Sequence, residues 1–206
     1  MLAYIFWHRP AAGVERDVYE LELQRFHRSL ALRPPSGFRG SAPLRAAELP
    51  WSVGGAEAAY EDWYLLDGWG AVGILEEAAV SRGHVSVHDA VARHSLLGAG
   101  SVYRLCEGQP ILAEVCSSMW VSPVGGHPRP GLADLLADGI DPQRTSLWRR
   151  CLALGPAPEL CLLSADPGLE SRCAGVGAER LPHGWSATLA AREPLEGGSF
   201  SDQRRG

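Results

Sequence analysis

Residues 6–13, FWHRPAAG, align faintly with residues 119–126, MWVSPVGG, and form an internal repeat. Each copy ends an apolar run typical of a strand and precedes a run with helical spacing. Two similar units of this kind predict a barrel in which two sheets from one chain face each other. The polar pair His8 and Arg9 of the first copy is replaced by valine and serine in the second. We therefore expect any functional site in the first half.

The composition indicates a globular chain of one large domain or two small ones. Of the 206 residues, 46% are apolar and 21% are charged, which is sufficient for a sizeable core. The net charge of −5 provides no basic surface, so we expect no nucleic-acid partner. No apolar run reaches the roughly 18 residues of a membrane span. The short apolar N-terminus is typical of a strand rather than a signal peptide. We expect no membrane partner and a cytoplasmic location.

Several catalytic classes are excluded by residue types and motifs. All 19 basic residues are arginines, so neither a lysine Schiff base nor a P-loop lysine is possible. The five cysteines lack the C-x-x-C spacing of zinc and redox sites, and we expect buried free thiols. The sequence contains no G-x-S-x-G elbow and no G-x-G-x-x-G fingerprint. It assigns no cofactor and no metal.

The first half has the pattern β-α-β-β-α-β, which is typical of a ferredoxin-like unit. A capping-box spacing at Ser86 and Asp89 predicts the start of a helix over residues 87–97 in this first unit, and Gly98 and Gly100 predict its end. The expected strands are 2–8, 38–46, 60–66 and 101–106, and the expected helices are 14–32, 69–80 and 87–97.

The second half is less regular, and its pattern predicts a degenerate copy. We expect strands at 111–122, 158–164 and 184–192, and helices at 131–138 and 144–154, while 168–180 shows no clear pattern. The predicted domains are 1–110 and 111–193. The polar, glycine-rich segment 194–206 predicts a disordered tail.

This order of elements resembles the dimeric α+β barrel superfamily, in which two ferredoxin-like units face each other sheet to sheet. Its members include cofactor-free monooxygenases, EthD-like proteins, stress-responsive barrel proteins and some haem enzymes. The resemblance implies an α+β fold of two tandem ferredoxin-like units forming a pseudo-two-fold barrel. It includes no motif that would assign catalytic residues, because one fold hosts many functions.

Candidate site residues follow from the alternation of side chains along strands. If helices cover the face with smaller aliphatic side chains, then His8, Glu61, Trp63 and Arg104 line the barrel interior. Alternatively, Glu61 and Arg104 form a structural ion pair and His8 ends its strand. The neighbouring Asp62 is interpreted as a solvated strand start.

The roles assigned to these residues describe a small-molecule site. His8 is the predicted base, since the ordinary pKa of histidine lies near neutrality. An arginine would hold an anionic group or oxyanion. An aromatic cavity with few polar groups is the usual form of such a site. The predicted catalytic residues are His8, Arg104 and Glu61, and the predicted substrate-binding residues are Tyr4, Phe6, Arg9 and Trp63.

The sequence leaves three functions open. The first is a barrel that binds a small apolar or aromatic molecule, with cofactor-independent oxidation or isomerisation. The second is a packed scaffold that associates with a partner protein or with a second copy in a homodimer. The third is a haem or metal protein using His84, His88 or His94, although only the first two have metal-ligand spacing. The seven tryptophans are interpreted as an aromatic core, with Trp148 on a helix.

Overall fold

The computed structural model describes residues 1–46, 59–81, 83–123, 141–154, 158–166, 185–195 and 199–200. The first half contains four strands and three helices in the order expected from the sequence. These are β1 (Leu2–Pro10), α1 (Arg16–Leu32), β2 (Phe38–Ala46), β3 (Ala59–Leu66), α2 (Trp69–Val80), α3 (Val85–Ala92) and β4 (Ser95–Gly108).

The second half, as far as it is described, consists of strands and two short 3₁₀ turns. These are η1 (Leu112–Glu114), β5 (Ser117–Pro123), η2 (Pro142–Arg144), β6 (Thr145–Ala153), β7 (Leu160–Ser164), β8 (Trp185–Pro194) and β9 (Ser199–Phe200). The predicted helix 131–138 and the unpatterned segment 168–180 lie outside the described residues.

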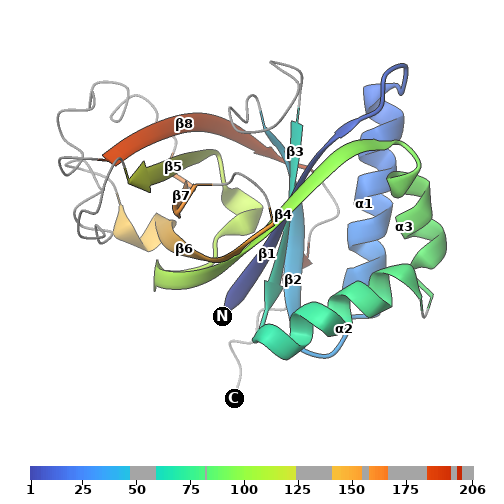
Figure 1. The fold of residues 1–206 in the computed structure, drawn as a ribbon, viewed down its shortest axis with the longest axis horizontal. Helices are drawn as coiled ribbons and strands as arrows, with labels where there is room; N and C mark the ends of the chain where they lie inside the picture. Colours follow the sequence, from blue (N-terminus) through green and yellow to red (C-terminus); the bar gives the residue numbers. More distant parts are fainter. Residues whose placement is uncertain are drawn as a thin grey trace.

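The described strands form one antiparallel sheet that closes on itself. Its first half has the order β2-β3-β1-β4, and its second half has the order β6-β7-β5-β8. Pairing of β4 with β6 and of β2 with β8 joins the halves at both edges. The helices α1, α2 and α3 lie on the outer side of the first-half strands, and the second-half strands lie on the other side (Figure 1). The first-half strands therefore carry two buried faces, which we call the barrel face and the helix face.

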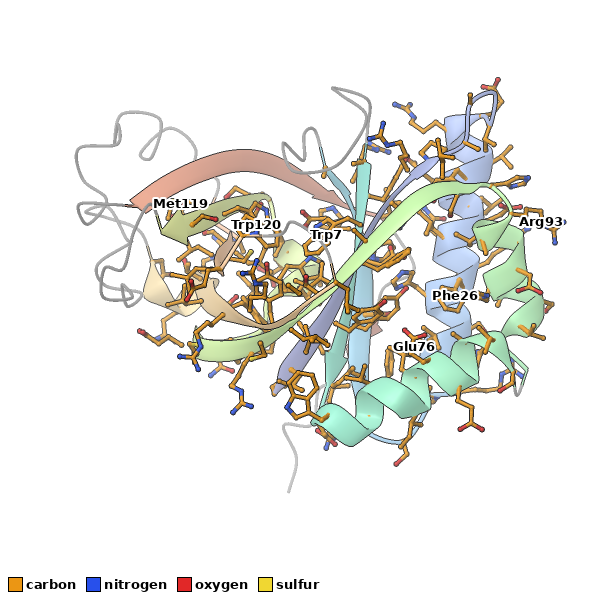
Figure 2. The ribbon with its side chains drawn as sticks, viewed as in Figure 1. Trp7, Phe26, Glu76, Arg93, Met119 and Trp120 are labelled. Atoms are coloured by element: carbon orange, nitrogen blue, oxygen red, sulfur yellow. The ribbon has the colours of Figure 1, made fainter. Side chains whose placement is uncertain are left out.

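The barrel face is a packed core. Within the described residues, large side chains from both halves pack against one another in the interior, whereas the sequence left open a cavity or a packed core there. The rings of Trp7 and Trp120 lie 5.7 Å apart, and those of Trp63 and Trp148 lie 5.5 Å apart, both edge to face. Figure 2 shows Trp7 and Trp120 on the barrel side, with Phe26 and Glu76 on the helix side. The core also includes Ile5, Leu44, Leu65, Tyr103 and Leu163.

The predicted helix 144–154 is instead the strand β6. Leu147, Trp148, Cys151 and Leu152 have the spacing of one helix face, which misled the sequence interpretation. In the structure β6 pairs with β4 on one side and β7 on the other. The ladder hydrogen bonds on both edges, together with full burial of Trp148, outweigh the local helical pattern. The predicted strand 111–122 is likewise shortened by η1.

The helix α3 begins earlier and ends earlier than its sequence predicts. His84 is the N-cap residue, so Ser86 lies inside the helix rather than at its start. Gly98 and Gly100 lie within β4 and do not end the helix, because α3 has already ended at Ala92. In the segment where the sequence predicts a tail, Ser199 and Phe200 pair with β2. No helix among the described residues is long and apolar enough to cross a membrane.

Replacing a tryptophan of the barrel core tests whether the interior is packed. Trp148 is fully buried, so Trp148→Ala should lower the free energy of unfolding by about 3–5 kcal/mol, measured by urea denaturation. The matched control is Trp69→Ala, since Trp69 is 48% exposed on α2. The control should change the free energy by less than about 0.5 kcal/mol. Equal effects of the two substitutions would contradict a packed interior.

Candidate functional site

The strand register separates the predicted site residues into two groups. In β1, Ile5 and Trp7 lie on the barrel face, opposite Trp63 and Glu61 of β3. His8 therefore lies on the helix face, opposite Tyr60. Directly paired residues of antiparallel strands share a face, so His8 cannot meet Glu61. Glu61 and Trp63 do line the barrel interior as predicted, whereas the same prediction for His8 is wrong.

Neither arginine predicted as an anion holder lines the cavity described below. Arg104 is exposed and stands opposite Leu2 of β1, so it faces neither the barrel interior nor the carboxylate of Glu61. Glu61 instead accepts a hydrogen bond from Trp63 Nε1 at 3.2 Å. Arg9 is buried where the β1–β4 register shifts. The predicted Glu61–Arg104 ion pair is therefore wrong, because the two side chains lie on opposite faces.

Two histidines hold one buried carboxylate on the helix face. His8 Nε2 lies 3.1 Å from Asp62 Oδ2, and His27 Nε2 lies 3.2 Å from Asp62 Oδ1. All three side chains are at most 4% exposed. The ring nitrogens are off the ideal hydrogen-bond line, so the contacts are best described as close charge contacts. Tyr64 adds a hydrogen bond from its hydroxyl to Asp62 Oδ2 at 3.1 Å.

Asp62 is ionised in the folded protein. Burial opposes ionisation, but the electrostatic attraction of the two imidazoles in contact with the carboxylate outweighs it and lowers the pKa of Asp62 below its ordinary 3.8. A buried carboxylate with this environment is typical of a functional site as well as of a structural pair. The carboxylate lies within 3.2 Å of one ring nitrogen of each histidine, so both imidazoles are turned toward it.

A chain of hydroxyl groups leads away from His8. His8 Nδ1 lies 2.5 Å from the Tyr19 hydroxyl, which lies 2.8 Å from Ser95 Oγ. Ser95 Oγ also lies 3.0 Å from the Val91 carbonyl, a second acceptor for its hydroxyl proton. Burial raises the pKa of Tyr19 well above its usual value, so its phenol stays neutral. The order Asp62, His8, Tyr19, Ser95 thus connects the sheet, α1 and the start of β4.

A cavity adjoins this chain between the sheet and the helices. It has two lobes of about 200 Å³ and 240 Å³, which share the rings of Phe6, Phe26, Tyr64 and His88. The larger lobe is also lined by His8, Asp62, Val91, Ala92 and Ser95. The smaller lobe is also lined by Tyr4, Leu75, Glu76, Ala79 and Val80.

Two glycines of β4 give the cavity its aromatic floor. A Cβ on Gly98 would overlap the ring of Phe6, and a Cβ on Gly100 would touch the ring of Tyr4. The sequence interpretation assigned these glycines to the end of a helix. Their physical role is to let two aromatic side chains of β1 lie across the neighbouring strand.

The predicted histidine cluster is not assembled. His84 is hydrogen-bonded to Ser29 Oγ at 2.7 Å, and His94 Nδ1 lies 2.7 Å from Glu22. His88 lies 3.2 Å from Asp89 and lines the cavity. In the part of the chain that the structure describes, no three potential metal ligands come together.

Sequence reasoning identified part of this site and missed the rest. Tyr4, Phe6 and His8 were on its candidate list, and all three line the cavity or its wall. Asp62 was interpreted as solvated, although it alternates with Tyr60 and Tyr64 on one strand face. His27 follows Phe26 on the buried side of α1, which was the available signal.

Comparisons with known proteins establish the fold. A "putative monooxygenase" from Fusobacterium nucleatum has a TM-score of 0.55 at 7% identity, covering 97% of this chain and 94% of its own. A second "putative monooxygenase", from Lactobacillus acidophilus, has a TM-score of 0.52 at 10% identity, covering 98% and 99%. An anthrone oxidase-like protein has a TM-score of 0.53 at 8% identity, covering 99% and 94%. The chain is therefore an α+β barrel protein.

These likenesses do not extend to the sequence or the reaction. No protein-family model and no curated protein matches the chain. Identities of this size show a shared fold alone, and one fold supports many activities. The function must therefore be argued from the cavity and its residues.

Removing the central carboxylate tests the electrostatics of the site. Asp62→Asn leaves two buried imidazoles without their charge partner and should cost about 3–5 kcal/mol of stability at pH 7. Because folding lowers the pKa of Asp62, its ionised form stabilises the fold at every pH above its ordinary 3.8. That stabilisation is lost progressively as the pH falls below this value toward the folded pKa.

Urea denaturation between pH 7 and pH 3 measures this difference. The wild type should lose stability steeply at the acid end, and Asp62→Asn should lose much less there. Asp17→Asn is the control, because its side chain is 93% exposed. Parallel pH profiles of the wild type and Asp62→Asn would contradict the assignment.

Proposed function

We propose that the chain binds a small, largely apolar or aromatic molecule between the sheet and the helices and removes a proton from it. The observation that carries the proposal is the contact between an apolar cavity and a buried chain of proton-transfer groups. An apolar cavity of about 150 Å³ binds benzene, so each lobe here fits one or two rings. Perturbed titratable groups at such a cavity are typical of catalytic sites.

His8 acts in this proposal through Tyr19 and Ser95. Its two ring nitrogens contact Asp62 and Tyr19, so neither is free to take a proton from a ligand directly. Ser95 Oγ lines the larger lobe and is the end of the chain that a ligand reaches. The sequence prediction of His8 as the base is retained, with two hydroxyl groups as the path.

The distances allow two complete arrangements of protons along the chain. In the first, Ser95 donates to Tyr19, Tyr19 donates to His8 Nδ1, and His8 Nε2–H faces ionised Asp62. In the second, each of these hydroxyl protons has moved one place toward His8, which becomes an imidazolium beside Asp62. Ser95 then carries the proton taken from the ligand and donates to the Val91 carbonyl. The ligand is left as an anion, and no proton is unaccounted for.

Proton removal next to a ring or carbonyl group begins two reactions. Return of the proton at another carbon completes an isomerisation. Attack of the same carbanion on dioxygen begins a cofactor-independent oxidation, and the names of two proteins of the same fold favour this second course. Tyr4 and Phe6 supply cavity walls, while Glu61, Trp63, Arg104 and Arg9 take no direct part in the step.

We also propose that the second half is a degenerate ferredoxin-like unit spanning 111–193. Its strand order β6-β7-β5-β8 repeats the order β2-β3-β1-β4 of the first half, which supports tandem units. The helical spacing of residues 131–138 in the sequence agrees with a helix between β5 and β6. A homodimer remains a prediction, which the mass of the native particle tests.

Deuterium exchange tests the proposed proton removal without knowledge of the natural substrate. The probe is 2-tetralone, a two-ring ketone with an acidic C–H group, incubated in D₂O and followed by proton NMR. The wild type should accelerate exchange above buffer. Tyr19→Phe should reduce the acceleration by about 10²-fold, since it breaks the path to His8. Tyr60→Phe is the control, because its hydroxyl donates to Glu20 and lies outside the path.

Exchange at the buffer rate with saturating wild-type protein would overturn proton removal from such a ligand. Equal rates for Tyr19→Phe and Tyr60→Phe would overturn the path through Tyr19. If 2-tetralone also fails to bind, the packed scaffold that associates with a partner becomes the better account of the chain.

A further inference from the structure

The charged groups of the cavity are unbalanced in sign. The described lining residues include two carboxylates, Asp62 and Glu76, and no arginine. Arg104, the predicted anion holder, is exposed on the sheet opposite Leu2. Asp62 is compensated by His8 and His27, so Glu76 is the lining carboxylate left to face a ligand, and a ligand carboxylate or phosphate would meet this like charge.

We propose that the natural ligand is an organic cation, an amine attached to an apolar or aromatic body. The inference rests on the proposed function, because it concerns the same cavity. It names the charge class of the ligand, and it replaces the anion-holding role that the sequence suggested for an arginine.

The smaller lobe has the composition of an ammonium site. Aromatic faces attract cations through their ring quadrupole, and this lobe opens to solvent at the exposed Glu76. The rings of Tyr4 and Tyr64 lie 6.0 Å apart in a stacked arrangement, and Phe26 meets Tyr64 edge to face at 6.4 Å. Glu76 of α2 lies at the same lobe and places a carboxylate beside these rings (Figure 2).

Tyr4 keeps Glu76 in place as an acceptor. Burial, the charge of Glu76 and a hydrogen bond with Glu76 raise the pKa of Tyr4, so the phenol remains a donor to that carboxylate. A carboxylate that accepts from one phenol retains lone pairs for an ammonium group. His88 contributes a ring edge-on to Phe26 at 5.6 Å and contacts Asp89 rather than Glu76.

The two lobes then take different ends of one molecule. The ammonium group lies by Glu76 in the smaller lobe, and the apolar body passes between Phe6, Phe26 and Tyr64. The far end of the body lies by Ser95 in the larger lobe, where the proposed proton transfer takes place. Because the two lobes share lining rings, one molecule can extend from the smaller lobe into the larger one.

Three probes of one scaffold isolate the effect of charge: 2-phenylethylamine, 2-phenylethanol and 3-phenylpropionate. Binding to the wild-type protein is measured by NMR titration at pH 7 and low salt. The amine should bind at least about tenfold tighter than the alcohol, and the carboxylate should bind most weakly. Glu76→Gln should weaken the amine by about five- to tenfold and leave the alcohol unchanged.

Glu77→Gln is the matched control, since Glu77 is the next residue of α2 and does not line the described cavity. Equal affinities of amine and alcohol, or a preference for the carboxylate, would overturn the inference and leave the proposed function intact. An equal loss in Glu76→Gln and Glu77→Gln would also overturn it. If none of the three probes binds and 2-tetralone exchange is not accelerated, the proposed function fails as well.

Discussion

The buried carboxylate of Asp62 is the constraint on which the helix side of this molecule depends. It lies between His8 of β1 and His27 of α1, so one charge joins the sheet to the helix that covers it. Burying a carboxylate is costly unless it is paired, and here two imidazoles and the Tyr64 hydroxyl share the task. The same contacts orient His8 toward Tyr19, which begins the path to the cavity. Structural and chemical roles thus reside in the same atoms.

The alternation of β1 and β3 gives the protein two interiors with different physics. Odd-numbered residues of β1 enter a barrel filled by tryptophans, where little space remains. Even-numbered residues face the helices, which pack on the sheet through Tyr19, Leu23 and Phe26 of α1, Leu75 of α2 and Val91 of α3 and leave a two-lobed cavity. Gly98 and Gly100 of β4 have no side chains, so the rings of Phe6 and Tyr4 from the neighbouring strand β1 can lie over them on the helix face. The ligand chemistry that we propose therefore belongs to the helix face, while the barrel face is a packed aromatic core.

The sequence predicted the first half of the fold better than the site. The strong aromatic strands and the apolar spacing of α1 follow local patterns, and the structure agrees with them. Which face of β1 lies against the helices depends on how the whole closed sheet packs. The assumption that small residues lie under helices placed His8 on the barrel face, whereas it lies on the helix face. The predicted helix 144–154, which contains Trp148, was wrong for another reason. Its residues have helical spacing, but pairing with β4 and β7 on both edges makes it the strand β6. His27 and Asp62 meet across long sequence distance, which no local pattern encodes.

The central claim is that the Nε2–H groups of both histidines are buried against the carboxylate of Asp62, which leaves His8 Nδ1 to Tyr19. Nitrogen-15 NMR of histidine-labelled protein tests it most directly. The account predicts two slowly exchanging Nε2–H signals, assigned by His8→Gln and His27→Gln, and both altered in Asp62→Asn. Ring N–H groups of His8 and His27 that exchange as fast as those of exposed histidines would contradict it.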